Sequence, residues 1–184
     1  MKTIRQSNTY LAMAAVILTA AVALTAAAQP LVPCGPDAAP VCFNGTFQGS
    51  DDISQEPTLI QSMEGIGTII GRFSSTTTLT LGPSGGTGTA TWMAANGDSI
   101  ATTVVGTPGG VGTAPCQGVG AQPGDLYIKV TLIHMITGGT GRFAGVQGSF
   151  TVTQYHDVSM QGSTHGTCGS YSGSITPLGA AHQE

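Results

Sequence analysis

Charged side chains are scarce in this chain, and basic ones most of all. Only 8% of the 184 residues are charged, and nine acids stand against five Lys and Arg. Lys2 and Arg5 lie at the very start, so the remaining sequence keeps only Arg72, Lys129 and Arg142. A protein so poor in cations cannot neutralise a phosphate backbone or an anionic lipid surface. We therefore expect neither nucleic acid nor, once its leader is removed, a membrane among its partners.

The chain also lacks the features of a nucleotide-binding loop and of a serine hydrolase. The glycine-rich stretch at 136–153 has no helical period after Gly141 and no Lys followed by Ser or Thr. A phosphate loop needs a helix N-terminus to hold the anion, so these glycines are predicted to form a turn. "GPSGG" at 82–86 matches G-x-S-x-G, but two strand-like segments flank it and no helix follows, which predicts a hairpin tip.

The N-terminal segment has the pattern of a secretory signal peptide. Lys2 and Arg5 precede an apolar run at 11–28 that ends in three alanines. This order predicts cleavage after about Ala28 and a secreted or periplasmic protein, whereas an uncleaved membrane anchor is the alternative. We divide the chain into the signal peptide (1–28), a Pro-rich lead-in (29–40), a β-domain (41–177) and a C-terminal tail (178–184).

Four cysteines remain after the predicted cleavage site: Cys34, Cys42, Cys116 and Cys168. An even number in an exported chain predicts two disulfides, and three pairings are possible. We favour Cys34–Cys42, which closes a short loop, with Cys116–Cys168 as the second bond. The closely spaced pairs of a zinc site are absent, and we expect no metal or other cofactor.

The β-domain shows side-chain alternation of period two from one end to the other. In 67–81, apolar residues such as Phe73 and Leu79 share one parity, and the other parity is polar: Arg72, Ser74, Thr76, Thr78 and Thr80. The segment 87–106 predicts a hairpin with its turn at 96–98, and 107–124 predicts a long loop. The strand predicted at 125–137 is apolar on both faces near Ile133 and Met135, which indicates a contact with a further element or subunit.

The segment "GGTGRFAGVQGSFTVT" at 138–153 resembles the glycine-bounded strand of the allene oxide cyclase-like and dirigent-like barrel proteins. "GRF" at 71–73 and "TATWMAANGDSI" at 89–100 are similar to neighbouring segments of exported bacterial proteins of that type, and the likeness covers most of 41–176. The resemblance implies an all-β fold with one antiparallel eight-stranded barrel, of a kind often found as dimers or trimers. No motif matches the catalytic residues of the family.

Four residues are candidates for ligand binding: His134, Arg142, Trp92 and Tyr127. His134 lies on the apolar parity of its strand, where it could act as a base or orient a ligand, or simply bond a backbone carbonyl in the core. Arg142 could meet a ligand carboxylate or pair with an acid at the barrel rim. His156, Asp157 and His165 could hold a metal, but their loose spacing favours a solvated turn.

Three functions are compatible with this sequence. The first is a non-catalytic exported barrel that binds a small apolar molecule or a protein partner. The second is an isomerase or cyclase acting on a lipid-derived substrate in the barrel cavity, as the resemblance suggests. The third is a structural barrel that associates with itself as a homo-oligomer. No complete catalytic set is evident, so we expect the first.

Overall fold

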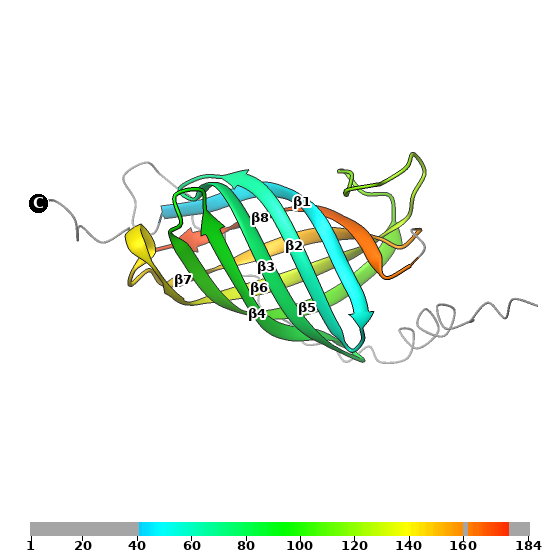
Figure 1. Ribbon diagram of the computed structural model, residues 1–184, viewed down its shortest axis with the longest axis horizontal. Helices are drawn as coiled ribbons and strands as arrows, with labels where there is room; N and C mark the ends of the chain where they lie inside the picture. Colours follow the sequence, from blue (N-terminus) through cyan, green and yellow to red (C-terminus); the bar gives the residue numbers. More distant parts are fainter. Residues whose placement is uncertain (1–40, 160–161, 177–184) are drawn as a thin grey trace, which may run out of the picture. The chain divides into compact units, whose positions relative to one another are not determined.

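A computed structural model describes residues 41–159 and 162–176 of the chain. In that part, eight strands form one closed antiparallel barrel: each strand pairs with its sequence neighbours, and β1 pairs with β8 (Figure 1). The strands are β1 (Val41–Gln55), β2 (Thr58–Gly67), β3 (Gly71–Gly82), β4 (Gly85–Ala94), β5 (Ser99–Gly112), β6 (Tyr127–Gly139), β7 (Gly148–Asp157) and β8 (Thr164–Ile175). The predicted barrel is confirmed. The predicted signal peptide, lead-in and tail lie outside the described residues.

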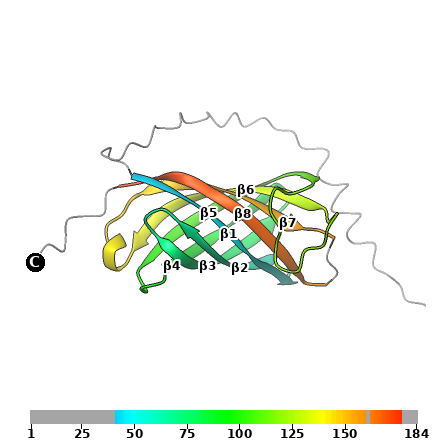
Figure 2. The same ribbon diagram turned by 90° about the horizontal axis from the view of Figure 1, so that it is seen from above.

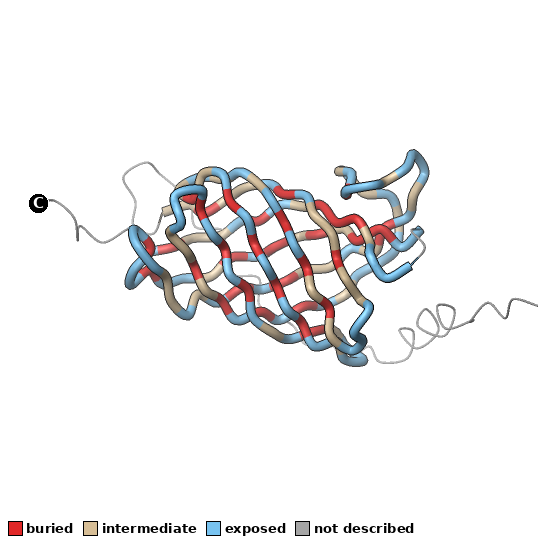
Figure 3. Tube along the Cα trace, in the orientation of Figure 1, coloured by how far each residue is buried: buried red, intermediate tan, exposed pale blue. Residues whose placement is uncertain are grey.

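Buried and exposed residues alternate along the strands, most regularly on β3 (Figure 3). On β3, Phe73 and Leu79 are buried, and Thr76, Thr78 and Thr80 between and beyond them are exposed. Successive side chains of a strand point to opposite faces, so a closed sheet places one parity inside. The parity predicted from the sequence for β3 is confirmed by the burial of this strand.

Aromatic rings fill the centre of the barrel interior. The cluster combines Phe43, Phe73, Trp92, Phe150 and Tyr171, all at most 5% exposed. Ring centroids lie 4.9 Å apart for Phe43 and Phe150 and 5.1 Å apart for Trp92 and Tyr171. These are the spacings of packed aromatic pairs in protein cores. At this level the barrel is occupied by its own side chains.

Glycines in β1 and β2 make room for the largest of these rings. Gly45 and Gly67 face the interior beside Tyr171, and a Cβ on either residue would overlap the Tyr171 side chain. In an interior packed this closely, no neighbour can move aside at low cost. Glycine at these two positions is therefore a packing requirement of Tyr171.

The predicted loop at 107–124 is partly wrong. Strand β5 continues to Gly112, with a register shift between Pro108 and Val111, so the connection to β6 spans 113–126. A bulge lets the sheet continue past a proline, which period-two alternation cannot reveal. The connection and the β7–β8 turn lie at one end of the barrel, and the β6–β7 connection lies at the other (Figures 1 and 2).

The disulfide Cys116–Cys168 is present, as predicted, with the two Cα atoms 6.0 Å apart. It ties the 113–126 connection to the outer face of β8. Cys42 is disulfide-bonded as well. Its predicted partner, Cys34, lies outside the described residues.

The glycine-rich segment at 136–153 forms a turn and a strand, as predicted. One short 3-10 turn, Gly141–Phe143, separates β6 from β7. Gly141 has φ of 56°, and a Cβ at this position would overlap the Asp98 carboxylate in the β4–β5 turn. Glycine is needed here for both its conformation and its size. The segment therefore packs one barrel turn against another and offers no helix N-terminus of the kind that holds a phosphate.

Candidate functional site

His134 lies in the middle of the aromatic cluster. Its ring stacks on Phe150 with centroids 4.7 Å apart and meets Trp92 edge-on at 5.5 Å. Its Nδ1 lies 3.0 Å from Thr102 Oγ1. Burial lowers the pKa of His134 to about 3, so the ring is neutral at physiological pH. His134 is a core histidine, although its partner is a threonine hydroxyl and not the backbone carbonyl that the sequence suggested.

Of the four predicted ligand-binding residues, the structure brings together only Trp92 and His134. Trp92 contacts His134 in the core, fully buried. Arg142 lies on the 3-10 turn, where its Nε is 3.5 Å from Asp98 Oδ2 and it donates a hydrogen bond of 3.0 Å to the Ile70 carbonyl. Tyr127 begins β6 at the opposite end, on the outward parity, and is nevertheless 4% exposed. Their role in ligand binding stays a prediction.

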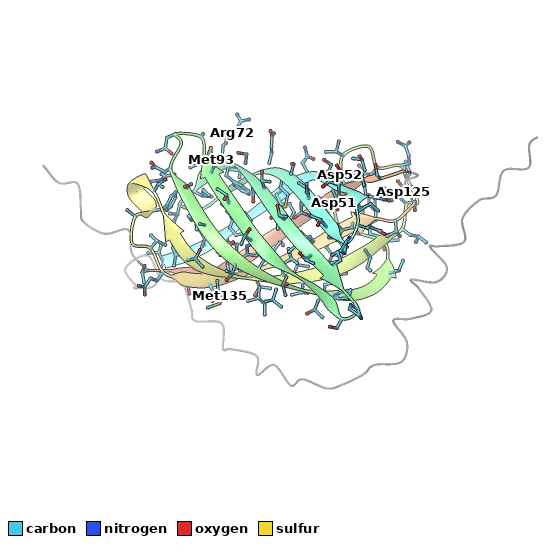
Figure 4. The ribbon with its side chains drawn as sticks, turned by 60° about the horizontal axis from the view of Figure 1, so that its bottom comes forward. Asp51, Asp52, Arg72, Met93, Asp125 and Met135 are labelled. Carbon is cyan, nitrogen blue, oxygen red and sulfur yellow. A yellow bond between two sulfur atoms is a disulfide. The ribbon has the colours of Figure 1, made fainter. Side chains whose placement is uncertain are left out.

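A belt of buried polar side chains lines the barrel interior between the aromatic cluster and one barrel end. We call it the polar belt, and its members are Asp51, Gln61, Thr77, Gln154 and His156, each at most 9% exposed. They come from β1, β2, β3 and β7. Figure 4 places Asp51 toward the barrel end that also carries Asp125.

Hydrogen bonds connect four members of the polar belt in a chain. Gln61 Nε2 donates to Asp51 Oδ1 at 2.7 Å, and His156 Nδ1 donates to Asp51 Oδ2. On the other side of the imidazole, the Gln154 amide nitrogen lies 2.7 Å from Nε2 and donates to it. The carboxylate thus fixes the imidazole tautomer, and the Gln154 amide covers the ring nitrogen that a general base would need.

Three oxygens of the polar belt have no hydrogen-bond partner among the described residues: Gln61 Oε1, Gln154 Oε1 and Thr77 Oγ1. All three belong to side chains with no exposed surface. A buried polar group that stays unpaired costs about 1–3 kcal/mol, so three in one region are unusual in a small domain.

Sequence reasoning missed the polar belt. A signal was present, because Asp51, Gln61, Gln154 and His156 all lie on the inward parity of their strands. A polar residue at an inward position of a strand marks a buried polar group that needs a partner.

The solvated turn predicted for His156 and Asp157 is wrong. Both residues end β7 and are buried, and they point to opposite sides of the barrel wall. His156 faces Asp51 inside, whereas Asp157 pairs in register with the outward Tyr127. His165 Nδ1 donates to the Asp157 carbonyl at 2.8 Å. Strand alternation alone separates the two neighbours, so they cannot face a common metal ion.

The outer surface carries a second distinctive feature on β5 and β6. Val105 and Ile133 are register partners, and Met135 follows on the same face; their exposed fractions are 55%, 47% and 53%. We call these three residues the outer apolar patch. A shallow groove of about 510 Å³ begins at Met135 and runs over 136–138 and 145–149. The sequence indicated that the strand is apolar on both faces near Ile133 and Met135, and these two outward side chains are exposed on the barrel surface.

Comparisons with protein-family models, curated proteins and solved structures give no match to this chain. The resemblance to the allene oxide cyclase-like and dirigent-like barrels therefore stays a prediction. Within 41–159 and 162–176, no helix is long and apolar enough to span a bilayer.

Proposed function

We propose that this protein is an exported, non-catalytic barrel that works as a protein-binding module through the outer apolar patch, and that its partner is a second copy of the chain. The observation that carries the proposal is the exposure of Val105, Ile133 and Met135 at neighbouring positions of β5 and β6. Contiguous apolar side chains on a soluble protein mark interaction surfaces.

Export is part of the proposal. The basic start and apolar run of residues 1–28 support it, as does the Cys116–Cys168 disulfide, which is compatible with an oxidising compartment.

The charge distribution allows a second copy to bind at this surface. The chain has a formal net charge of −4, so two copies repel each other unless they meet at an uncharged surface. Asp52 and Glu64 belong to β1 and β2, which lie across the barrel from β5 and β6. The residues paired with the patch are uncharged: Thr87, Thr103, Ser149 and Thr151. Contact through the patch keeps the acidic walls of both copies far apart.

The proposed contact surface has the apolar centre and polar rim that are typical of protein interfaces. Three apolar side chains form its centre, and threonine and serine hydroxyls form a polar rim. A two-fold axis near Ile133 would place the same patch on both copies, which is the commonest symmetry of soluble oligomers.

The other functions considered from the sequence have less support. A small apolar ligand inside the barrel would compete with the aromatic side chains that already fill its centre. A cyclase would need an accessible base, but His134 is enclosed and neutral, and Gln154 covers His156 Nε2. The cyclase alternative stays a prediction.

Sedimentation equilibrium of the full mature chain tests the proposal. We expect the mass to rise from one copy to two between about 1 µM and about 1 mM, the range of a small interface. Ile133→Asp should keep the chain monomeric throughout. Met93→Asp is the matched control, because Met93 is also 47% exposed and lies on β4, away from the patch; Figure 4 shows it apart from Met135. A monomeric wild type, or equal effects of the two substitutions, would refute the proposal.

A further inference from the structure

The shallow groove beside the outer apolar patch lies where β6 and β7 separate. The ladder between these two strands ends at the pair Met135 and Ser149. Beyond this pair, β6 continues to pair with β5 up to Gly139, whereas Gly148 pairs with β8. The sheet therefore opens between the two strands, and the groove of about 510 Å³ follows this opening.

The groove has an apolar inner side and walls of strand backbone. Val146 belongs to the barrel core, Ile136 packs against that core, and Met135 is half exposed at the entrance. A Cβ built on Gly138 or on Gly145 meets no atom within 4 Å, so both walls are open at these positions. Backbone N–H and C=O groups of separated strands need partners, and an extended segment can supply them together with an apolar side chain.

The last described residue, Thr176, lies at one wall of this groove. Thr176 directly follows β8 and donates its N–H to the Gln147 carbonyl at 2.8 Å, while the Gln147 N–H donates to Thr176 Oγ1 at 2.9 Å. Gln147 is itself one of the groove residues. Figure 1 shows the end of β8 at the same barrel end as the 3-10 turn. Residues 177–184, with the sequence PLGAAHQE, therefore begin beside the groove.

Residues 177–184 are long enough to occupy the groove. Eight extended residues span up to about 26 Å. From Gln147 to Ser149 the wall is about 7 Å long, and Met135 lies about 5 Å away across the ladder. The segment therefore reaches the entrance of the groove with about half of its length.

The composition of residues 177–184 also suits the groove. The residues that line the groove are uncharged, and the segment offers an apolar side chain, Leu178, and no Asp, Glu, Lys or Arg before Glu184. The Pro-rich lead-in at 29–40 is less suitable, because its four prolines have no N–H to donate and it contains Asp37. The short connection to Thr176 keeps the segment at a high effective concentration near the groove, which favours the same chain over a second copy.

We infer that the groove is a docking site for residues 177–184 of the same chain, with Leu178 packed against Ile136 and Val146. The docked segment covers Met135 and so restricts access to the outer apolar patch, which makes it an intramolecular regulator of association. This regulatory role rests on the proposed function, whereas the docking itself does not.

NMR of the methionine methyl groups tests the docking. The full mature chain is compared with a chain that ends at Thr176, and both carry Ile133→Asp to prevent association through the outer apolar patch. We expect the Met135 methyl signal to move when residues 177–184 are removed. The Met93 methyl signal should stay unchanged, because Met93 is exposed on β4, away from the groove.

Two substitutions within the segment identify the contact. Leu178→Ser should move the Met135 signal as the truncation does, whereas Gln183→Ser is the control and should not, since it removes no apolar side chain. A Met135 signal that is the same with and without residues 177–184 would overturn the inference. So would a signal that responds only to removal of 29–33, which would assign the groove to the lead-in, or a difference that disappears on dilution, which would assign it to a second copy.

Sedimentation equilibrium of chains that retain Ile133 measures the regulatory consequence. Removal of residues 177–184 should lower the Kd of association several-fold, because copies with a docked segment are not competent to associate. A Met135 signal that moves with an unchanged Kd would refute the regulatory role and leave the docking in place. A chain that stays monomeric with and without the segment would refute the proposed function, and the NMR result would still decide on the docking.

Discussion

Removing the Cys116–Cys168 disulfide should destabilise the barrel by a predictable amount. The bond joins residues 52 positions apart, and the chain-entropy model gives about 4 kcal/mol for a loop of that length. The double variant Cys116→Ala/Cys168→Ala also frees the 113–126 connection in the folded state, which offsets part of the effect. We therefore expect a loss of about 2–4 kcal/mol in the free energy of unfolding.

The single tryptophan provides the assay. Trp92 is fully buried in the aromatic cluster, so its fluorescence reports global unfolding in urea. The native emission should not change in the variant, because the disulfide lies on the outer side of β8 and the ring lies inside. The urea m-value should increase, since a chain without this cross-link exposes more surface when it unfolds. Reductant cannot replace the double variant, because Cys42 is disulfide-bonded too.

Two results would contradict this reasoning. A loss below about 1 kcal/mol would mean that the bond does not restrict the unfolded chain as the loop length requires. A shifted native emission of Trp92 would mean that the disulfide holds the core in place and that its contribution is not confined to the unfolded state. Proteolysis within 113–126 should become faster in the variant, while cleavage within the strands stays slow.

Two further predictions concern the barrel interior. Burial lowers the pKa of His134 to about 3. As the pH is lowered below about 6.5, this histidine is therefore protonated in the unfolded state but stays neutral in the folded state. The free energy of unfolding should then fall by up to about 1.4 kcal/mol for each pH unit, until the pH approaches 3. Urea titrations of His134→Phe should lack this component, and an unchanged pH slope would show that His134 is not its source. Gly67→Ala should cost about 1–3 kcal/mol because the new methyl group overlaps Tyr171. Gly138→Ala on β6 is the matched control, because a Cβ there meets no atom within 4 Å and Gly138 has no positive φ. A Gly67→Ala loss no greater than that of Gly138→Ala would rule out the overlap.

The arrangement of the strands could be predicted because alternation is a local property. Thr76, Thr78 and Thr80 on one parity and Phe73 and Leu79 on the other identify a half-buried strand without knowledge of its neighbours. The same parity placed His134 inside. The extension of β5 to Gly112 escaped this reasoning, because the bulge after Pro108 interrupts the alternation while the pairing with β6 continues.

The candidate site could not be predicted in the same way, because its members are distant in sequence. Asp51 and His156 are 105 positions apart, and β8 lies between their strands. Their contact depends on the register of β1 with β8 and of β8 with β7, and a shift of one residue would turn each side chain to the other face. Inward polar residues could have been noted from parity, but their partners could not.

By itself, the amino-acid sequence determined that the domain consists of β-strands and which faces of β3 and β6 are buried, whereas it left three pairings of the four cysteines open. Only the tertiary structure decided that rings fill the centre of the barrel, that a carboxylate and an imidazole meet beyond them, and that Val105, Ile133 and Met135 are left uncovered outside. The reason is physical: side-chain parity follows from the geometry of one strand, whereas packing, pairing and exposure follow from how eight strands close on one another.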